Sequence, residues 1–196
     1  MHAARDAAIA SRTAGGIIEM NEGKRSITLL STGGTIEKTY DPLHGVLSND
    51  VSVLEVLLAQ LELEGVELRH VELMNKDSAD MADADHRAIA EHAMEYGATC
   101  DGVVVVHGTD RLAETGDAIV EMSGSAPGIP IVLTGAMRPW ILRNSDAQQN
   151  LTEALMAVQL LKPGVYVCMH NKVLAFPGVV KDVAHLRFVS TRSAGA

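Results

Sequence analysis

The strongest evidence for the architecture of this chain is DGVVVVHGTDRLAETG, residues 101–116. Within it, Gly102–Val106 is apolar without interruption, which is typical of a central parallel strand that is buried on both faces. Leu112–Met122 then shows the apolar pattern of a helix. A buried strand that leads through a short polar loop into a helix is part of a β-α-β unit, so these residues predict an α/β fold.

The same alternation of strands and helices extends along most of the chain. We expect further strands at Ser26–Ser31, Val66–Leu73, Ile131–Thr134, Val165–Met169 and Val173–Phe176, and further helices at Val51–Leu63, Asp83–Tyr96 and Ala147–Leu161. Such units form right-handed crossovers. We therefore predict one doubly wound α/β domain with a mostly parallel sheet, flavodoxin-like or Rossmann-like, at residues 26–190. A loose Ala-rich N-terminal extension at 1–25 and a C-terminal tail at 191–196 would flank it.

The composition argues against several classes of protein. The chain has 196 residues and a formal net charge of -9, and its Lys and Arg do not cluster, which disfavours a nucleic-acid-binding face. No apolar run reaches the roughly 18 residues that a membrane span needs. Residues 1–25 contain no uninterrupted apolar region typical of a signal peptide. We expect a soluble cytoplasmic protein with no nucleic-acid or membrane partner.

Metal and cofactor sites are also disfavoured. Cys100 and Cys168 lie far apart and form no CxxC motif. His86 and His92 are six residues apart, which does not place them on one helical face, and the remaining histidines show no HxxxH or HExxH spacing. The glycines at Thr32–Thr35 form neither GxGxxG nor a P-loop. We expect no metal and no cofactor.

Polar residues follow the predicted strands at the edge where ligands of parallel sheets bind, which is beyond the carboxyl ends of the strands. These segments are Thr32–Thr35, Met74–Met81, His107–Asp110, Gly135–Pro139 and Val179–Asp182. Together they supply hydroxyls, carboxylates, glycines and one lysine, so we expect the site to lie there.

Two interpretations stay open for the TGGT segment. A hydroxyl beside a double-glycine turn can attack a carbonyl while exposed backbone N–H groups hold the oxyanion. The same turn can also be a simple strand-to-loop connection or an anion-binding nest. The residues alone do not choose between them.

The other polar loops are ambiguous in the same way. Asp110 is either the cap of the following helix or a ligand for a substrate ammonium, with Thr109 holding an attacking water. Lys181 stands among valines and is either a surface lysine or a partly desolvated one that relays protons.

Five motifs in this order resemble the bacterial-type L-asparaginase/glutaminase family. They are ITLLSTGGTIEKTYD at 27–41, DGVVVVHGTDRLAETG at 101–116, PIVLTGAMRP at 130–139, NSDAQQNL at 144–151 and VLAFPGVVKD at 173–182. The pair TGGTI and HGTD at this spacing is specific to the family, and the resemblance extends over roughly residues 26–188. It makes the chain similar to the N-terminal catalytic domain of the family.

The resemblance implies hydrolysis of L-asparagine to L-aspartate and ammonia through an acyl-enzyme intermediate, with Thr35 as the nucleophile. It implies that Tyr40, in a mobile loop, assists that hydroxyl, and that Thr109, Asp110 and Lys181 form a second catalytic group. Ser78 would bind the substrate α-carboxylate and Asp110 its α-ammonium. The implied substrate-binding residues are Gly34, Ser78, Ala79, Gly108 and Asp110.

Two departures from the family bear on the substrate. Relatives of ordinary length carry a second domain whose glutamate reaches the substrate ammonium, and Ala79 stands where many members have a glutamine. We therefore expect a short single-domain member or a fragment, a weak hold on the α-ammonium and a high KM. Alternatives are an amidase for glutamine or another small amide, and a non-catalytic amino-acid-binding module. The family also implies a homo-oligomer, a dimer or a tetramer.

Overall fold

A single six-stranded sheet organises the molecule. The structure is a computed structural model and describes residues 23–49, 52–124 and 127–192. The sheet order is β4-β1-β5-β6-β7-β8, with β1 Arg25–Gly33, β4 Val66–Lys76, β5 Gly102–Val106, β6 Pro130–Thr134, β7 Gly164–Met169 and β8 Lys172–Ala175. The first five of these strands are parallel, and only β8 runs antiparallel, on β7. In chain order the parallel strands read 2-1-3-4-5, the flavodoxin-like order, so the predicted fold is confirmed.

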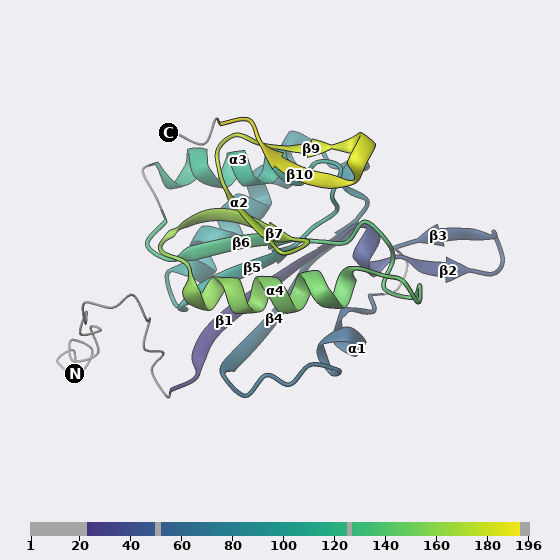
Figure 1. Cartoon of the computed structure of the whole chain (residues 1–196), viewed down its shortest axis with the longest axis horizontal. Helices are drawn as coiled ribbons and strands as arrows, with labels where there is room; N and C mark the ends of the chain where they lie inside the picture. The colour runs from purple at the N-terminus through teal and green to yellow at the C-terminus, as the bar shows by residue number, and fades with distance from the viewer. Residues whose placement is uncertain (1–22, 50–51, 125–126, 193–196) are drawn as a thin grey trace.

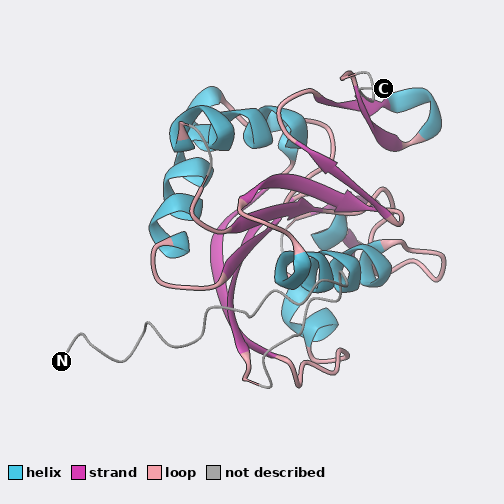
Figure 2. Ribbon diagram, turned by 60° about the vertical axis from the view of Figure 1, so that its left-hand side comes forward, coloured by secondary structure: helices cyan, strands magenta, loops and turns pink. Residues whose placement is uncertain are grey.

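Helices cover both faces of this sheet (Figures 1 and 2). On one face, α1 Leu54–Leu58 and α4 Ala147–Leu160 pack with Val104 and Val106. On the other, α2 Asp83–Gly97 and α3 Leu112–Ser123 pack with Val103 and Val105. Every residue of β5 is buried, because alternate side chains enter the two cores. This explains the uninterrupted apolar run.

Among the described residues, two small hairpins lie outside the main sheet. Thr39–Asp41 (β2) pairs with Val46–Ser48 (β3), and Figure 1 shows this hairpin projecting from the body. Val179–Asp182 (β9) pairs with Arg187–Ser190 (β10). The sequence analysis predicted no strand at either place: it put Tyr40 in a loop and gave Val179–Asp182 only as the segment that follows the last predicted strand. In the described parts of the chain, three single-turn 3-10 helices complete the elements: η1 Thr35–Glu37, η2 Ser78–Asp80 and η3 Val183–His185.

The helix expected at Val51–Leu63 is wrong in length. The described helix α1 covers only Leu54–Leu58, and the chain then turns toward β4. Leu61 and Leu63 still pack against the core from the turn. The apolar spacing therefore indicated which side chains contact the core, and not which residues are helical. The expected extension at 1–25 and tail at 191–196 lie outside the described residues, except for 23–25 and 191–192.

Gly116 lies inside α3, where the absent side chain makes room for the buried Phe176 ring. A β-carbon added at Gly116 would lie 2.2 Å from Cζ of Phe176. Gly→Ala in an unhindered helix stabilises by roughly 0.5–1 kcal/mol, but overpacking costs about 1–3 kcal/mol. We expect Gly116→Ala to lower the free energy of unfolding by about 1 kcal/mol in denaturant titrations.

The double variant Gly116→Ala/Phe176→Leu is the matched control, compared with Phe176→Leu alone. Without the ring, the added methyl has room, so the alanine should become neutral or stabilising. An equal loss with and without the ring would contradict the packing argument.

Candidate active site

Three loops meet in close contact at the point where the sheet topology reverses. Gly34 follows β1, Ser78 follows β4 and Gly108 follows β5. A β-carbon on Gly34 would lie 2.3 Å from Cα of Gly108, and one on Gly108 would lie 2.4 Å from Oγ of Ser78. Only glycine fits at either position, and Gly34 also has a φ of 81°. Because β1 lies between β4 and β5, the loops of the two neighbours reach it from both sides.

Thr35 begins a short 3-10 helix, Thr35–Glu37, directly after this contact. The turn before it is fixed from two sides. The Gly34 N–H donates to the carbonyl of Lys76 over 2.8 Å, and the Asn49 amide donates to the carbonyl of Gly34 over 2.9 Å. The Thr35 side chain, directly after this hydrogen-bonded turn, is half-buried. Thr35 therefore directly follows, in the chain, the point where Gly34 touches the Gly108 loop.

The second predicted group is assembled around one ammonium. Lys181 Nζ donates to Oγ1 of Thr109 over 2.8 Å and to Oδ1 of Asp110 over 2.7 Å. Thr109 is buried, and 12% of the Lys181 side chain and 55% of the Asp110 side chain are exposed. Lys181 reaches the group from β9, whereas Thr109 and Asp110 follow β5. Residues 71 positions apart in the chain thus share one site.

Ser78 connects this group to the loop after β4. Its side chain is fully buried, and its Oγ accepts the backbone N–H of Asp110 over 3.2 Å. Asp77 accepts the N–H of Ala79 over 3.0 Å and forms an ion pair with Lys38. Lys38 comes directly after the Thr35 turn, so the ion pair fastens that turn to the Ser78 loop.

The structure places the predicted residues unequally. Gly34, Gly108, Ser78, Thr109, Asp110 and Lys181 are brought together, and Thr35 is adjacent to the Gly34 contact. Ala79 is exposed beside Ser78, and its methyl group offers no hydrogen bond. Tyr40 lies on β2 opposite Leu47 and is 60% exposed. Among the described residues, no hydrogen bond joins Tyr40 to Thr35, so its assisting role stays a prediction.

His107 is a residue of this site to which the sequence analysis gave no role. It is fully buried at the end of β5, and its Nδ1 lies 2.7 Å from the carbonyl oxygen of Gly108. Burial lowers the pKa of His107 to about 4, so the ring is neutral at pH 7. In the sequence, the signal that singled out His107 was its place as a polar residue directly after a buried strand. The contact fixes the backbone of the loop that carries Thr109.

Comparison with known proteins identifies the family. A model described as "Asparaginase, N-terminal" matches residues 26–187. The chain belongs to the asparaginase family. An L-asparaginase from Thermococcus kodakarensis is 36% identical over 150 residues, which cover 76% of this chain and 45% of that protein. A glutamyl-tRNA(Gln) amidotransferase subunit from Haloquadratum walsbyi is 34% identical over 164 residues, or 83% of this chain and 37% of that protein.

Solved asparaginase structures share the fold. The thermostable L-asparaginase from Thermococcus kodakarensis superposes with a TM-score of 0.76 at 32% identity, over 84% of this chain and 51% of that one. A probable cytoplasmic L-asparaginase from Campylobacter jejuni gives 0.68 at 29% identity, over 85% and 52%. The chain thus spans about half the length of these structures, and less of the relatives above. Among the helices that the structure describes, none combines the length and the apolar composition that a membrane span requires.

The ion pair between Asp77 and Lys38 gives stability a defined pH dependence. The Lys38 ammonium holds the pKa of Asp77 below its usual value. A carboxyl whose pKa is lowered on folding stabilises the fold above its unfolded pKa, about 3.9, and this contribution disappears as pH falls through the folded pKa. Asp77→Asn keeps an acceptor for Ala79. The wild type should therefore exceed this variant in free energy of unfolding at pH 7, and the difference should shrink below about pH 4.

Denaturant titrations of both proteins from neutral to acidic pH measure this difference. Lys38→Met is the matched control, because it should remove the same pH-dependent increment from the other side of the pair. A difference that stays constant down to the acid limit would show that the ion pair does not stabilise the fold.

Proposed function

We propose that the site hydrolyses the side-chain amide of L-asparagine to L-aspartate and ammonia, with Thr35 as the nucleophile. The observation that carries the proposal is the arrangement of Lys181, Thr109 and Asp110 beside the Gly34–Gly108 contact, because Thr35 directly follows Gly34 in the chain. A non-catalytic binding module needs no partly buried lysine that donates to a threonine hydroxyl. Membership of the asparaginase family supports the same chemistry.

The proposed reaction proceeds in two displacements. In the first, Oγ1 of Thr35 attacks the amide carbon, and the hydroxyl proton passes to the departing nitrogen. The C–N bond then breaks, ammonia leaves, and the acyl group remains on Thr35 as an ester. Water then attacks the ester and releases aspartate. Thr109 Oγ1 accepts a hydrogen bond from Lys181, so its own proton and remaining lone pair are oriented for the incoming water. Tyr40, on the projecting hairpin, is the residue proposed to assist Thr35.

Recognition of the substrate follows from atoms that the site leaves available. The Ser78 oxygen accepts the Asp110 N–H, so its hydroxyl proton can be donated to the α-carboxylate. Asp110 uses Oδ1 for Lys181, which leaves its other oxygen for the α-ammonium. The Ala79 methyl contributes nothing polar to this interaction. Asp110 therefore carries the recognition of the ammonium in this chain.

A second candidate is release of ammonia for an amidotransferase reaction. Several relatives are themselves subunits of glutamyl-tRNA(Gln) amidotransferases, which are enzymes built from more than one kind of chain. In that case glutamine or a larger amide would be the substrate, and the ammonia would pass to a partner protein.

A cytoplasmic location and a homo-dimer or homo-tetramer remain part of the proposal. The location is supported by one structural relative, the probable cytoplasmic L-asparaginase from Campylobacter jejuni.

Thr35→Ala should abolish ammonia release from asparagine while the fold persists. Thr39→Ala, the next hydroxyl along the chain, is the matched control and should retain activity. The measurement is ammonia production from asparagine and from glutamine, together with circular dichroism of each variant. Full activity in Thr35→Ala would refute the assignment of the nucleophile. A wild type that binds asparagine without turnover would favour the binding module.

Asp110→Asn and Lys181→Met should separate binding from chemistry. Loss of the Asp110 charge should raise KM for asparagine about tenfold or more, because roughly 1.4 kcal/mol of ammonium recognition corresponds to a factor of ten. Lys181→Met should instead lower kcat, because Thr109 loses its donor. An unchanged KM in Asp110→Asn would mean that Asp110 acts only at the start of α3.

A further inference from the structure

Residues 135–140, which we call the β6 loop, follow β6 directly and contact the loop that carries Thr109. A β-carbon added to Gly135 would lie 2.2 Å from the carbonyl oxygen of His107 and 3.5 Å from Cγ2 of Thr109. At the ends of the two strands, the His107 N–H donates to the carbonyl of Thr134 over 2.8 Å. The backbone of the β6 loop therefore lies directly against the loop after β5, close to the methyl group of Thr109.

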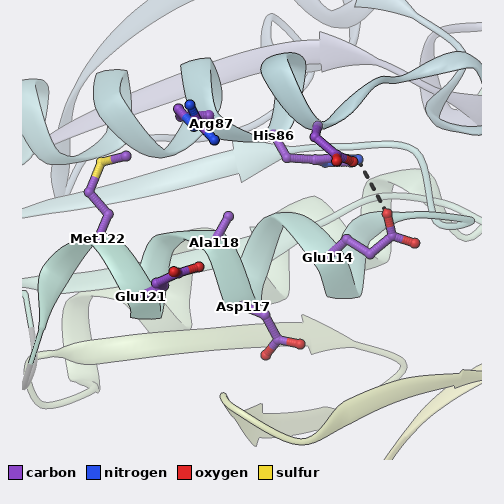
Figure 3. A pocket seen from close by; sticks show the side chains of 8 residues that line it. His86, Arg87, Glu114, Asp117, Ala118, Glu121 and Met122 are labelled. Atoms are coloured by element: carbon purple, nitrogen blue, oxygen red, sulfur yellow. Dashed lines mark ion pairs between the residues drawn. The ribbon is translucent and has the colours of Figure 1, made fainter.

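Side chains of α3 and α2 hold the beginning of the loop after β5. Nε2 of His107 lies 2.8 Å from Oγ1 of Thr115, and Nδ1 of His86 lies 2.6 Å from the same oxygen. His86 in turn contacts Glu114 across the gap between the two helices, with 3.4 Å between Nε2 and Oε2 (Figure 3). These contacts fix His107. Thr109 comes two residues later, so its placement also depends on what holds the β6 loop.

One buried carboxylate holds the β6 loop. The Asp146 side chain is only 3% exposed. Its Oδ2 accepts the N–H of Met137 over 3.0 Å, and its Oδ1 accepts the N–H of Arg138 over 2.9 Å. Burial alone would raise the pKa of Asp146, but the donors of Met137, His170 and Arg138 outweigh it and lower the pKa below its usual value. The carboxyl is therefore ionised at neutral pH and accepts two successive backbone N–H groups.

Asn150 adds a third attachment between α4 and the β6 loop. The side chain of Asn150 is fully buried. Its Nδ2 donates to the carbonyl of Gly135 over 2.9 Å and to Oδ2 of Asp146 over 2.8 Å. Two side chains at the start of α4 thus hold three backbone groups of the loop, at Gly135, Met137 and Arg138.

The carboxylate of Asp146 does not cap its own helix. Asp146 stands directly before α4, where an aspartate usually accepts a backbone N–H of the first helical turn. Among the described residues, its side chain accepts no such bond. The Ser145 hydroxyl accepts the Ala147 N–H instead, over 3.1 Å. The start of the helix is thus stabilised without the carboxylate, which is left to the β6 loop.

We propose that Asp146 is a positioning residue for the amide hydrolysis proposed above, on which this inference rests. Its carboxylate fixes the β6 loop, and Gly135 then keeps the Thr109 methyl group from moving toward β6. The Thr109 hydroxyl consequently stays 2.8 Å from Nζ of Lys181 and keeps the orientation proposed for the incoming water. Asp146 acts through the loop and takes no part in the chemical steps.

Asp146→Asn tests this role, because an amide presents an acceptor oxygen on one side only. Its NH2 group faces the N–H of either Met137 or Arg138, so at least one bond to the β6 loop is lost. We expect kcat for asparagine, per folded molecule, to fall about ten- to hundredfold, since a misplacement of about 1 Å can cost a hundredfold in rate. KM should not rise, because Ser78 and Asp110 still bind the substrate. Ammonia release gives both constants, and circular dichroism gives the folded fraction.

Asp101→Asn is the matched control. It makes the same chemical change at a carboxylate that accepts the Ser26 N–H over 2.9 Å, at the opposite end of β1 from the site, and it should leave kcat unchanged. Asn150→Ala is the second variant, used if Asp146→Asn does not fold. It removes the bond to the Gly135 carbonyl and should also lower kcat without a rise in KM. An equal fall in the control, a rise in KM, or an unchanged kcat in the folded site variant would overturn the proposal.

NMR supplies a readout that does not depend on turnover. In Asp146→Asn, the N–H of Met137 or Arg138 should exchange with solvent faster than in the wild type, and the Thr109 methyl resonance should shift. In Asp101→Asn, these signals should keep their wild-type values. Unchanged signals in Asp146→Asn would refute the positioning role alone if the wild type is active. A wild type that releases no ammonia would instead refute the proposed function, and the positioning role with it.

Discussion

The contact between Gly34 and Gly108 is the constraint on which the rest of the site depends. Their backbones approach so closely that a side chain at either position would overlap the other loop or Ser78. The approach is available because β1 lies between β4 and β5 in the sheet, so the loops that leave these three strands converge at one edge. The position of Thr35, the burial of Ser78 and the placement of Thr109 all follow from it.

The parts of the fold that the sequence predicted are those in which burial alone determines the pattern. Gly102–Val106 is recognisable because a strand covered on both faces has no polar position. The same logic failed at Val51–Leu63, where Leu61 and Leu63 reach the core from a turn. The β2 and β9 hairpins were missed because each strand is short and depends on a partner that local periodicity does not reveal.

The residues of the candidate site were predictable from motifs and not from burial patterns. The motifs identified Thr109, Asp110 and Lys181 as one group only through family resemblance, since nothing in the residues shows that β9 returns to the end of β5. The structure provides that closure through two hydrogen bonds of Lys181. It also shows what resemblance did not, the ion pair that fastens the Thr35 turn to the Ser78 loop through Lys38. Long-range contacts of this kind depend on the topology of the strands, which a local sequence pattern does not reveal.

His107 connects the loop after β5 to α3 and α2 through hydrogen bonds, because a buried polar group must be satisfied. Its ring is neutral, so the hydrogen bond to the Gly108 carbonyl determines which nitrogen is left as an acceptor. Thr115 must then donate toward His107 and accept from His86, and the direction of every bond in the series is set by one carbonyl oxygen. Each hydroxyl or ring nitrogen has only one orientation compatible with its neighbour. The direction of the hydrogen bonds from Thr115 to His107 and from His86 to Thr115 is therefore a consequence of the backbone of the loop that follows β5.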